Sequence, residues 1–554
     1  MSEATGTPHR TGRAAAIVGL AVMCSRVLGL AREILFNALF GTKLMQYFIA
    51  AFRIPNLLRD LFAEGALSTA FITVFSKKIA TEGQAEAWKL ANRIATLTLV
   101  FMGVITLLGV LLSDHLISLV AGGYVGKSES GYPGGDAALT AQLTATMFPF
   151  ILMVSLAAQV MGMLNAKRVF GWPAMASSFF NIGSIAGGII LGYGMDHSFG
   201  PRALFGLAYG TLIGGFLQLA VQFPALRKVG YHPRPDFHWR DSGVRDVLYT
   251  MAPAIVAASA VQVNVMINTG YATHAEAGSV TWLNNAFRLM QLPLGMFGVA
   301  IGTVTLPFLS EKAALGHRED FRGALARGIR LVFFLTVPAS AGLWMLGEPI
   351  LSIIYEHGKV TPEDIRQSAA ALRYYAMGLA AYAGMKVLAP AFYAIGRRWI
   401  PMAISIVSIG VNWGLNELLT RHWGWGFRGL AMSTGVVALA NFGALYFFMR
   451  KVISGMESRR LVITLVKIFL ATDALIVVCL GCQWLMLDRW AHMGFILRLC
   501  SLLVTIGLAG GAFALVASLL RLREMRDMLS AVARRLSRRS NRGAKEMTSE
   551  TNDQ

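Results

Sequence analysis

The sequence predicts an all-α polytopic membrane protein, and three observations lead to that prediction. First, 55% of the 554 residues are hydrophobic and only 14% are charged, which is too little polar surface to cover a water-soluble globule of this size. Second, apolar runs of about 20 residues, each long enough to cross a bilayer as a helix, recur along nearly the whole chain. Third, one apolar segment occurs twice, which predicts two pseudo-symmetric lobes.

The apolar runs give about fourteen predicted spans. The first run, residues 14–24, lacks the small residue that a lipoprotein cleavage site needs just before Cys24, so we expect it to be retained as a span. The clearest later runs have their cores at 97–112, 182–193, 204–221, 332–346, 402–411, 430–448, 462–487 and 495–519.

The duplication is visible in two pairs of segments. The tripeptide Ala-Phe-Arg at residues 51–53 recurs at 286–288, 235 positions later. A pair of basic residues followed by a proline occurs at 167–173 and again at 397–401, at a similar offset. Two matches in the same order indicate the duplicated halves typical of transporters.

Lysine and arginine gather in alternate loops. The positive-inside rule places these loops and both termini in the cytoplasm, which explains the formal charge of +20 without a nucleic-acid partner. In the tail, Met525, Leu529, Val532 and Leu536 form an apolar stripe among arginines. That stripe predicts either a helix on the anionic inner leaflet or a solvated basic tail. The predicted organisation is a cytoplasmic segment 1–13, a first lobe 14–228, a second lobe 229–455, a helix pair 456–520 and a basic tail 521–554.

Charged side chains concentrate in a few predicted spans, where inserting each one costs about 2.5–3.5 kcal/mol. They are Arg26, Arg32 and Glu33 in the first span, Arg53, Arg59, Asp60 and Glu64 in the second, and Arg288 in the duplicate of the second. Helical spacing allows the three charges of the first span to share one broad face. Pro55 and Gly65 favour a break or bend in the second span, and irregular backbone is tolerated in a membrane where it lines a cavity.

Four of these charges point to an anionic ligand. Arg26, Arg32, Arg59 and Arg288 would repel one another if they converged without an anion, and the nearby acids offset only part of that repulsion. The guanidinium fork is always charged and matches phosphate or carboxylate oxygens. A pyrophosphate would satisfy such a cluster, whereas a cationic drug would not. Arg53 and Lys467 could equally extend their charged groups to the lipid headgroups and have no role in binding an anion.

At these residues the sequence resembles the MurJ (MviN) lipid II flippases of the MOP exporter superfamily. The resemblance rests on the segments 25–33, 55–66, 288–307 and 386–394 and extends over nearly the whole chain. It implies two six-helix lobes around a central cavity and a final helix pair that forms a groove for a polyprenyl tail. It also implies the substrate, an undecaprenyl-pyrophosphate disaccharide-pentapeptide moved from the cytoplasmic to the periplasmic leaflet of the bacterial inner membrane.

The resemblance assigns roles to individual residues. It implies that the four arginines bind substrate and that Glu33 and Glu64 lie at acidic gate positions. The stretch 53–65 is a candidate substrate-facing element or gate, so Arg53 and Asp60, together with Lys386, are candidates for gate or secondary roles. We expect a transporter and not an enzyme, without metal or cofactor, and we expect a coupling ion or the membrane potential to drive it. Lipid II and membrane lipids are the expected partners, with cell-wall synthesis proteins as further candidates. Gln46, Phe287 and Gln291 stand where acidic residues are frequent in the family, so coupling through those carboxylates stays open.

Other functions remain open at this point. A flippase for another polyprenyl-pyrophosphate-linked saccharide would need the same chemistry. A MOP-type multidrug exporter would need acidic residues within a lobe, whereas the lone acid Asp473 lies in the penultimate span. A membrane enzyme acting on polyprenyl phosphates is disfavoured because the sequence has no D-D, D-x-D or H-E-x-x-H constellation.

Overall fold

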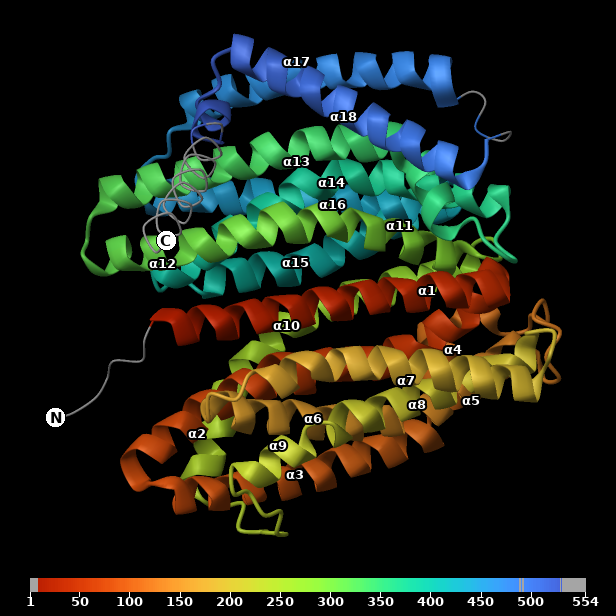
Figure 1. The fold of residues 1–554 in the computed structure, drawn as a ribbon, viewed down its shortest axis with the longest axis vertical. Coiled ribbons are helices and arrows are strands. Elements are labelled where there is room, and N and C mark those ends of the chain that lie inside the picture. The colour runs from red at the N-terminus through yellow and green to blue at the C-terminus, as the bar shows by residue number, and fades with distance from the viewer. Residues whose placement is uncertain (1–7, 488–489, 491–492, 529, 531–554) are drawn as a thin grey trace, which may run out of the picture. The chain divides into compact units, whose positions relative to one another are not determined.

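The structure is a computed structural model of the chain and describes residues 8–487, 490, 493–528 and 530. Regular structure in these residues is helical throughout, in α-helical, π-helical and 3-10 segments (Figure 1). The predicted all-α class is therefore confirmed. The greater part of the basic tail 521–554, with most of its apolar stripe, lies outside the described residues.

Within the described residues, ten segments are long and apolar enough to cross a membrane, which indicates a multi-pass membrane protein. They are Gln84–Leu111, Gly135–Ala166, Gly171–Met195, Pro201–Lys228, Ser279–Ala314, Arg318–Tyr355, Trp399–His422, Gly426–Val452, Ser458–Leu485 and Phe495–Leu519. Helices α1 (Pro8–Leu58), α10 (Ser242–His274) and α14 (Pro362–Ala394) are also long, but they carry charged or amide side chains along their length. The predicted total of about fourteen spans stays a prediction.

The chain packs as two compact units, and the first contains residues up to Asn284 together with Ile354–Ile365 and Ile409–Leu430. Its complete helices are α1, η1 (Arg59–Leu67), α2 (Ser68–Glu82), α3 (Gln84–Leu111), α4 (Ser113–Val120), η2 (Gly122–Tyr124), α5 (Gly135–Met147), α6 (Pro149–Ala166), α7 (Gly171–Met195), η3 (Pro201–Ala203), α8 (Leu204–Ala220), α9 (Phe223–Lys228), α10 and η5 (Glu417–His422).

The second unit contains Asn285–Ile353, Arg366–Ser408 and the residues from Ala431 onward. Its complete helices are η4 (Leu294–Val299), α12 (Ala300–Ala314), α17 (Ser458–Cys482), η6 (Gln483–Leu487) and α18 (Phe495–Leu519). Helices α11 (Ser279–Pro293), α13 (Arg318–Tyr355), α14, α15 (Trp399–Asn416) and α16 (Gly426–Val452) contribute residues to both units.

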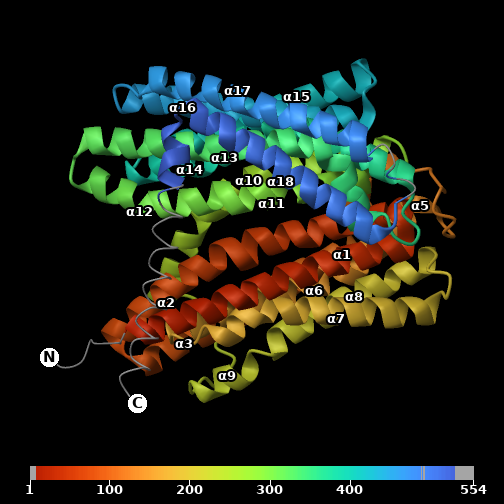
Figure 2. The same cartoon turned by 45° about the horizontal axis from the view of Figure 1, so that its top comes forward.

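Helices α7 and α8 lie side by side in the first unit (Figures 1 and 2) because glycines line their contact. A Cβ added to Gly206 would lie 2.2 Å from the backbone nitrogen of Gly192, and one added to Gly210 would lie 2.5 Å from that of Gly188. Small residues let helix backbones approach closely where the surrounding lipid gives no hydrophobic drive for association. These two helices form a firm support for α1, which packs against α7.

Helix α1 is two helices joined at Gly41, where the backbone adopts φ 72° and ψ 165°. A Cβ at Gly41 would lie 3.3 Å from both the Cβ and the carbonyl oxygen of Lys359. The backbone nitrogen of Lys359 donates to the carbonyl of Ala38 at 2.8 Å. The kink therefore separates the predicted first and second spans, and glycine is needed there for both its conformation and its lack of a side chain.

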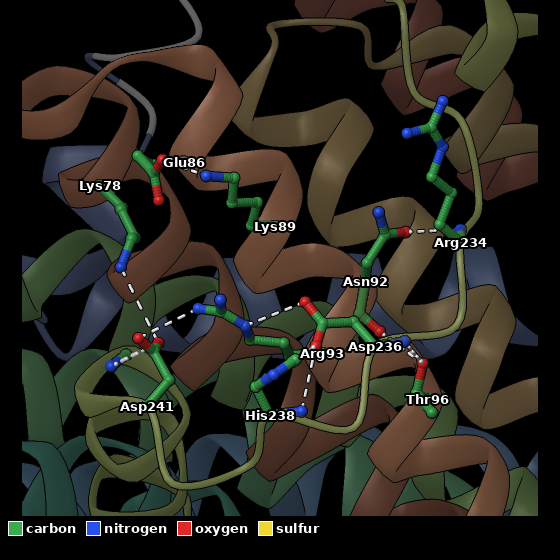
Figure 3. A network of polar contacts seen from close by, with 11 residues as sticks. Lys78, Glu86, Lys89, Asn92, Arg93, Thr96, Arg234, Asp236, His238 and Asp241 are labelled. Carbon is green, nitrogen blue, oxygen red and sulfur yellow. Dashed lines mark hydrogen bonds and ion pairs between the residues drawn. The ribbon is translucent and has the colours of Figure 1, made fainter.

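A polar network fixes the start of α10 against α2 and α3 (Figure 3). Arg93 of α3 binds Asp236 at 3.1 Å and Asp241 at 3.0 Å, and Asp241 also accepts from the backbone of Gly243 at the helix start. Lys78 of α2 lies 3.9 Å from Asp241. Because Asp241 caps α10, these contacts set the position from which α10 runs past η1.

In the second unit, α17 and α18 lie beside each other within the predicted C-terminal pair 456–520 (Figures 1 and 2). Arg330 of α13 binds Glu457 at 2.9 Å and Glu524 at 3.2 Å, so one guanidinium joins α13 to residues that precede α17 and follow α18. The Lys467 Nζ donates to the carbonyl of Leu520 at 2.9 Å. Lys467 thus stabilises the C-terminal end of α18, where a positive charge is favoured.

We expect the Asp236 contacts to make stability depend on pH. Burial raises the pKa of Asp236, but hydrogen bonds from the backbone and ring of His238 and the charge of Arg93 outweigh burial and hold the pKa below its ordinary value of 3.8. A depressed pKa contributes stability above that ordinary value, and the contribution is lost as the pH falls through the lower folded pKa. Asp236→Asn should therefore lower the thermal unfolding midpoint at neutral pH, and its difference from the parent protein should shrink towards pH ~3.

The measurement is thermal unfolding of detergent-solubilised protein across this pH range. Asp246→Asn, which changes an exposed acid, serves as the control. A deficit of Asp236→Asn that stays constant with pH would contradict the assignment.

Candidate substrate-binding site

The two copies of the repeated segment share a backbone irregularity. The π-helix η1 begins at Arg59 and the π-helix η4 begins at Leu294, 235 positions later, which is the offset of the sequence repeat. π-helical turns are rare, and they occur frequently at functional sites. Both follow a helix that contains a proline, Pro55 in α1 and Pro293 in α11. The duplicated spans therefore interrupt their α-helices at corresponding positions.

The interruption in the second span differs from the predicted break at Pro55. Helix α1 continues through Pro55 to Leu58, and the chain then widens into the π-helix η1 without losing helical structure. A proline lacks the N–H that an α-helix uses at that position, and a wider turn nearby accommodates the missing bond. The irregular backbone includes Gly65, as the sequence predicted, but it starts at Arg59.

The three charges of the first span have different surroundings. Arg26 is exposed, whereas Arg32 is half-buried with its Cζ 5.1 Å from the centre of the Phe180 ring. Glu33 is buried, and its Oε1 accepts a hydrogen bond of 2.8 Å from Asn284 Nδ2 of α11. The aromatic face of Phe180 suits a guanidinium group through a cation–π contact. Arg32 is thus oriented by an aromatic ring and Glu33 by a neutral amide.

Helix α7 aligns this part of α1. Asn181, which follows Phe180, donates from Nδ2 to the carbonyl of Ser25 at 3.0 Å. A Cβ at Gly29 would lie 3.5 Å from the same nitrogen, which is ordinary contact distance. Two consecutive residues of α7 therefore hold the turns of α1 that carry Arg26 and Arg32.

Asp60 organises the start of η1. Its Oδ1 accepts two hydrogen bonds from Arg59, at 3.1 Å from Nε and 2.9 Å from Nη2. Its Oδ2 accepts from Gln262 Nε2 of α10 at 3.0 Å and from Asn56 Nδ2 at 3.3 Å. Both N–H groups of Arg59 converge on one carboxylate oxygen, which fixes the position of that edge of the guanidinium group. Asp60 therefore aims Arg59 and ties the π-helix to α10 at the same time.

The remaining predicted site residues are placed as follows. Arg53 is half-buried on α1, one turn before Leu57. The side chain of Glu64 lies outside the described residues. Arg288 on α11 and Lys386 on α14 are exposed and belong to the second unit. The convergence of the four arginines on one anion stays a prediction.

The sequence reasoning missed the neutral partners of these charges. Gln262 and Asn284 hold the two acids, and they come from segments more than 200 positions away from Asp60 and Glu33. Amide side chains inside long apolar helices are a usable signal, because hydrogen-bonding groups in a membrane need partners. Asn268 illustrates this: its Oδ1 accepts from Asn412 at 2.9 Å and from Asn416 at 2.7 Å.

A second polar cluster joins α1 to segments that follow it by hundreds of residues. Buried Asp364 accepts from Thr42, from Trp282 Nε1 at 2.8 Å and from the backbone of Thr361 at 2.9 Å. Buried Gln46 accepts from the backbone of Gly278 at 2.9 Å. Gln46 stands at a position where an acidic residue is frequent in the resembled family. In this chain its uncharged side chain accepts the hydrogen bond from a backbone N–H.

We expect Asp60→Asn to destabilise the protein, because Arg59 loses its two-point charged partner. The expected loss is about 1–2 kcal/mol, since both side chains are partly exposed. Glu86→Gln is the matched control: it removes an exposed ion pair with Lys89, and its effect should be smaller than that of Asp60→Asn because solvent screens an exposed pair. Thermal or denaturant unfolding in detergent gives both values, and equal losses in the two variants would contradict the role given to Asp60.

Comparisons with known proteins agree with the resemblance. A family model described as lipid II flippase MurJ matches residues 36–501. The chain is 33% identical over 507 residues to a probable lipid II flippase MurJ of Bdellovibrio bacteriovorus, covering 90% of this chain and 93% of that protein. It is 34% identical over 436 residues to the lipid II flippase MurJ of Burkholderia cenocepacia, covering 77% and 82%.

Solved structures show the same fold. A lipid II flippase MurJ in an inward closed conformation superposes with a TM-score of 0.71 at 22% identity, over 93% of this chain and 100% of that chain. An inward-facing multidrug resistance MATE transporter of the MOP superfamily superposes with a TM-score of 0.64 at 16% identity, over 79% and 98%. Sequence identity over most of the length and a matching family model together establish that the chain belongs to the MurJ lipid II flippase family.

Proposed function

We propose that this chain moves lipid II, the undecaprenyl-pyrophosphate disaccharide-pentapeptide, from the cytoplasmic to the periplasmic leaflet of the bacterial inner membrane. The observation that carries the proposal is the family match over residues 36–501. The family consists of transporters, and the two π-helical interruptions at one repeat offset suit a transporter built from duplicated halves. The positive-inside distribution supports cytoplasmic termini.

In the proposed cycle, Arg26, Arg32, Arg59 and Arg288 bind the pyrophosphate. A guanidinium fork can donate two parallel hydrogen bonds to phosphate oxygens, and one edge of the Arg59 guanidinium is already held by Asp60. The ring of Phe180 on α7 holds the Arg32 guanidinium over its face through a cation–π contact. Pyrophosphate binding would lower the mutual repulsion of the arginines and favour closure on the cytoplasmic side, as alternating access requires.

The hydrogen bonds of Asp364 with Thr42, Trp282 and Thr361 are proposed to hold the periplasmic side closed. They join Thr42, beside the Gly41 kink, to the connection between α13 and α14, which the charge distribution predicts to be periplasmic. Lys359 of the same connection donates from Nζ to the carbonyl of Phe199 at 3.1 Å. These bonds would have to break when the site opens outward.

The membrane potential, worth about 2.3 kcal/mol per charge per 100 mV, or a coupling ion would drive the empty, positively charged site back to its cytoplasm-facing state.

We expect Arg32→Ala and Arg59→Ala to abolish lipid II flipping without loss of membrane insertion. Each variant removes one guanidinium group that donates charge-assisted hydrogen bonds to the pyrophosphate. Two such hydrogen bonds are worth several kcal/mol in a desolvated site. The measurement is the exposure of lipid II to a membrane-impermeant reagent in proteoliposomes. Arg240→Ala, which changes an exposed loop arginine, is the matched control and should transport normally.

Normal transport by Arg32→Ala or by Arg59→Ala would contradict the proposed site. The substrate itself is tested by depleting the protein in cells: lipid II should accumulate in the inner leaflet. Accumulation of a different polyprenyl-pyrophosphate-linked saccharide would instead show that the proposed substrate is wrong.

A further inference from the structure

An apolar cavity of about 580 Å³ lies within the second unit, between α13, α14, α16 and α17. Four aromatic side chains line it: Phe333, Trp344, Phe442 and Phe469. The Phe333 and Phe442 rings meet edge to face, with centroids 5.2 Å apart. The lining contains none of the four predicted substrate-binding arginines, and α17 contributes to it from the predicted C-terminal helix pair.

Three polar side chains interrupt this apolar lining, and one of them, Thr472, has its hydroxyl satisfied by the carbonyl of Ile468 at 2.8 Å. Asp473 lies in the middle of α17, 15 residues after its start and nine before its end. Ser340 of α13 also lines the cavity, and its Oγ is buried without a hydrogen-bond partner among the described residues. A carboxylate in the middle of a membrane span is costly and marks a functional site whose partner should be identified.

The partner of Asp473 is not a basic residue of its own helix. Lys467, the other charged residue in the interior of α17, already donates to the carbonyl of Leu520. Nor does the cavity suit a multivalent metal ion, because the described residues contain no group of three His, Cys, Asp or Glu side chains that could hold one. Calcium or magnesium would need several more oxygen ligands than one carboxylate and one hydroxyl supply.

A lipid or polyprenyl chain would fit the apolar lining but would bring no positive charge to Asp473. An organic cation with apolar substituents matches every feature: its charge pairs with the carboxylate, its substituents fill the apolar volume, and aromatic faces attract a cation at close range. We propose that this cavity is a binding site for hydrophobic organic cations, such as lipophilic phosphonium or quaternary ammonium compounds, with Asp473 as the counter-ion.

The test measures binding of radiolabelled tetraphenylphosphonium to the purified full-length protein in detergent. Asp473→Asn should weaken binding by at least about tenfold, because the cation then loses its only charged partner in the cavity. Trp344→Leu keeps an apolar lining but removes an aromatic face, so it should weaken cation binding by a smaller factor. Asp114→Asn, which changes an exposed acid that does not line the cavity, should bind as the parent protein does.

Competition by a neutral compound of similar shape, triphenylphosphine oxide, separates charge recognition from apolar binding. Triphenylphosphine oxide should compete weakly with tetraphenylphosphonium for the parent protein. In Asp473→Asn, which lacks the carboxylate, the neutral compound and the cation should compete equally. Thermal unfolding of each variant shows that the fold is retained. The proposal is overturned if the parent protein does not bind the cation, if Asp473→Asn binds it equally well, or if the neutral compound competes as strongly as the cation, since the cavity would then be a site for lipid chains.

Discussion

A charged group within a membrane-spanning helix needs a partner, and this requirement organises the helices of the first unit. Asp60 binds Arg59 through two hydrogen bonds and is itself held by Gln262 of α10. Arg32 lies over the ring of Phe180 on α7. Asp60, Glu33 and Arg32 thus each contact a neighbouring helix, and these contacts fix the direction of side chains that would otherwise turn towards lipid headgroups.

The supporting helices can be this specific because they are themselves firmly placed. Glycines bring α7 and α8 into backbone contact, so Phe180 and Asn181 present a rigid surface to α1. The ion pairs of Arg93 fix the start of α10, which carries Gln262. The π-helix η1 packs against α10 and α6, and its counterpart η4 appears one repeat later. Rigid helices on either side of an irregular turn are a suitable arrangement for a substrate site that must change its access.

The sequence alone predicts the all-α class, the repeat and the positions of the charges. Hydropathy, a fixed repeat offset and charged residues within apolar runs can all be identified in the linear sequence. It cannot predict the partners. Asn284 is 251 positions from Glu33, and a neutral amide gives no charge signal that would pair it with an acid. The expected break at Pro55 was displaced to Arg59 for a related reason: proline shows that a bond is missing but not where the helix widens.

The central claim is that guanidinium groups on α1, η1 and α11 bind one pyrophosphate. The most direct measurement is a cryo-electron microscopy structure of the protein in lipid nanodiscs with lipid II bound. The account predicts density for the pyrophosphate within hydrogen-bonding distance of Arg32 and Arg59, with the Arg59 guanidinium still hydrogen-bonded to Asp60. Pyrophosphate density away from these arginines, or arginine side chains directed to the lipid headgroups, would contradict it.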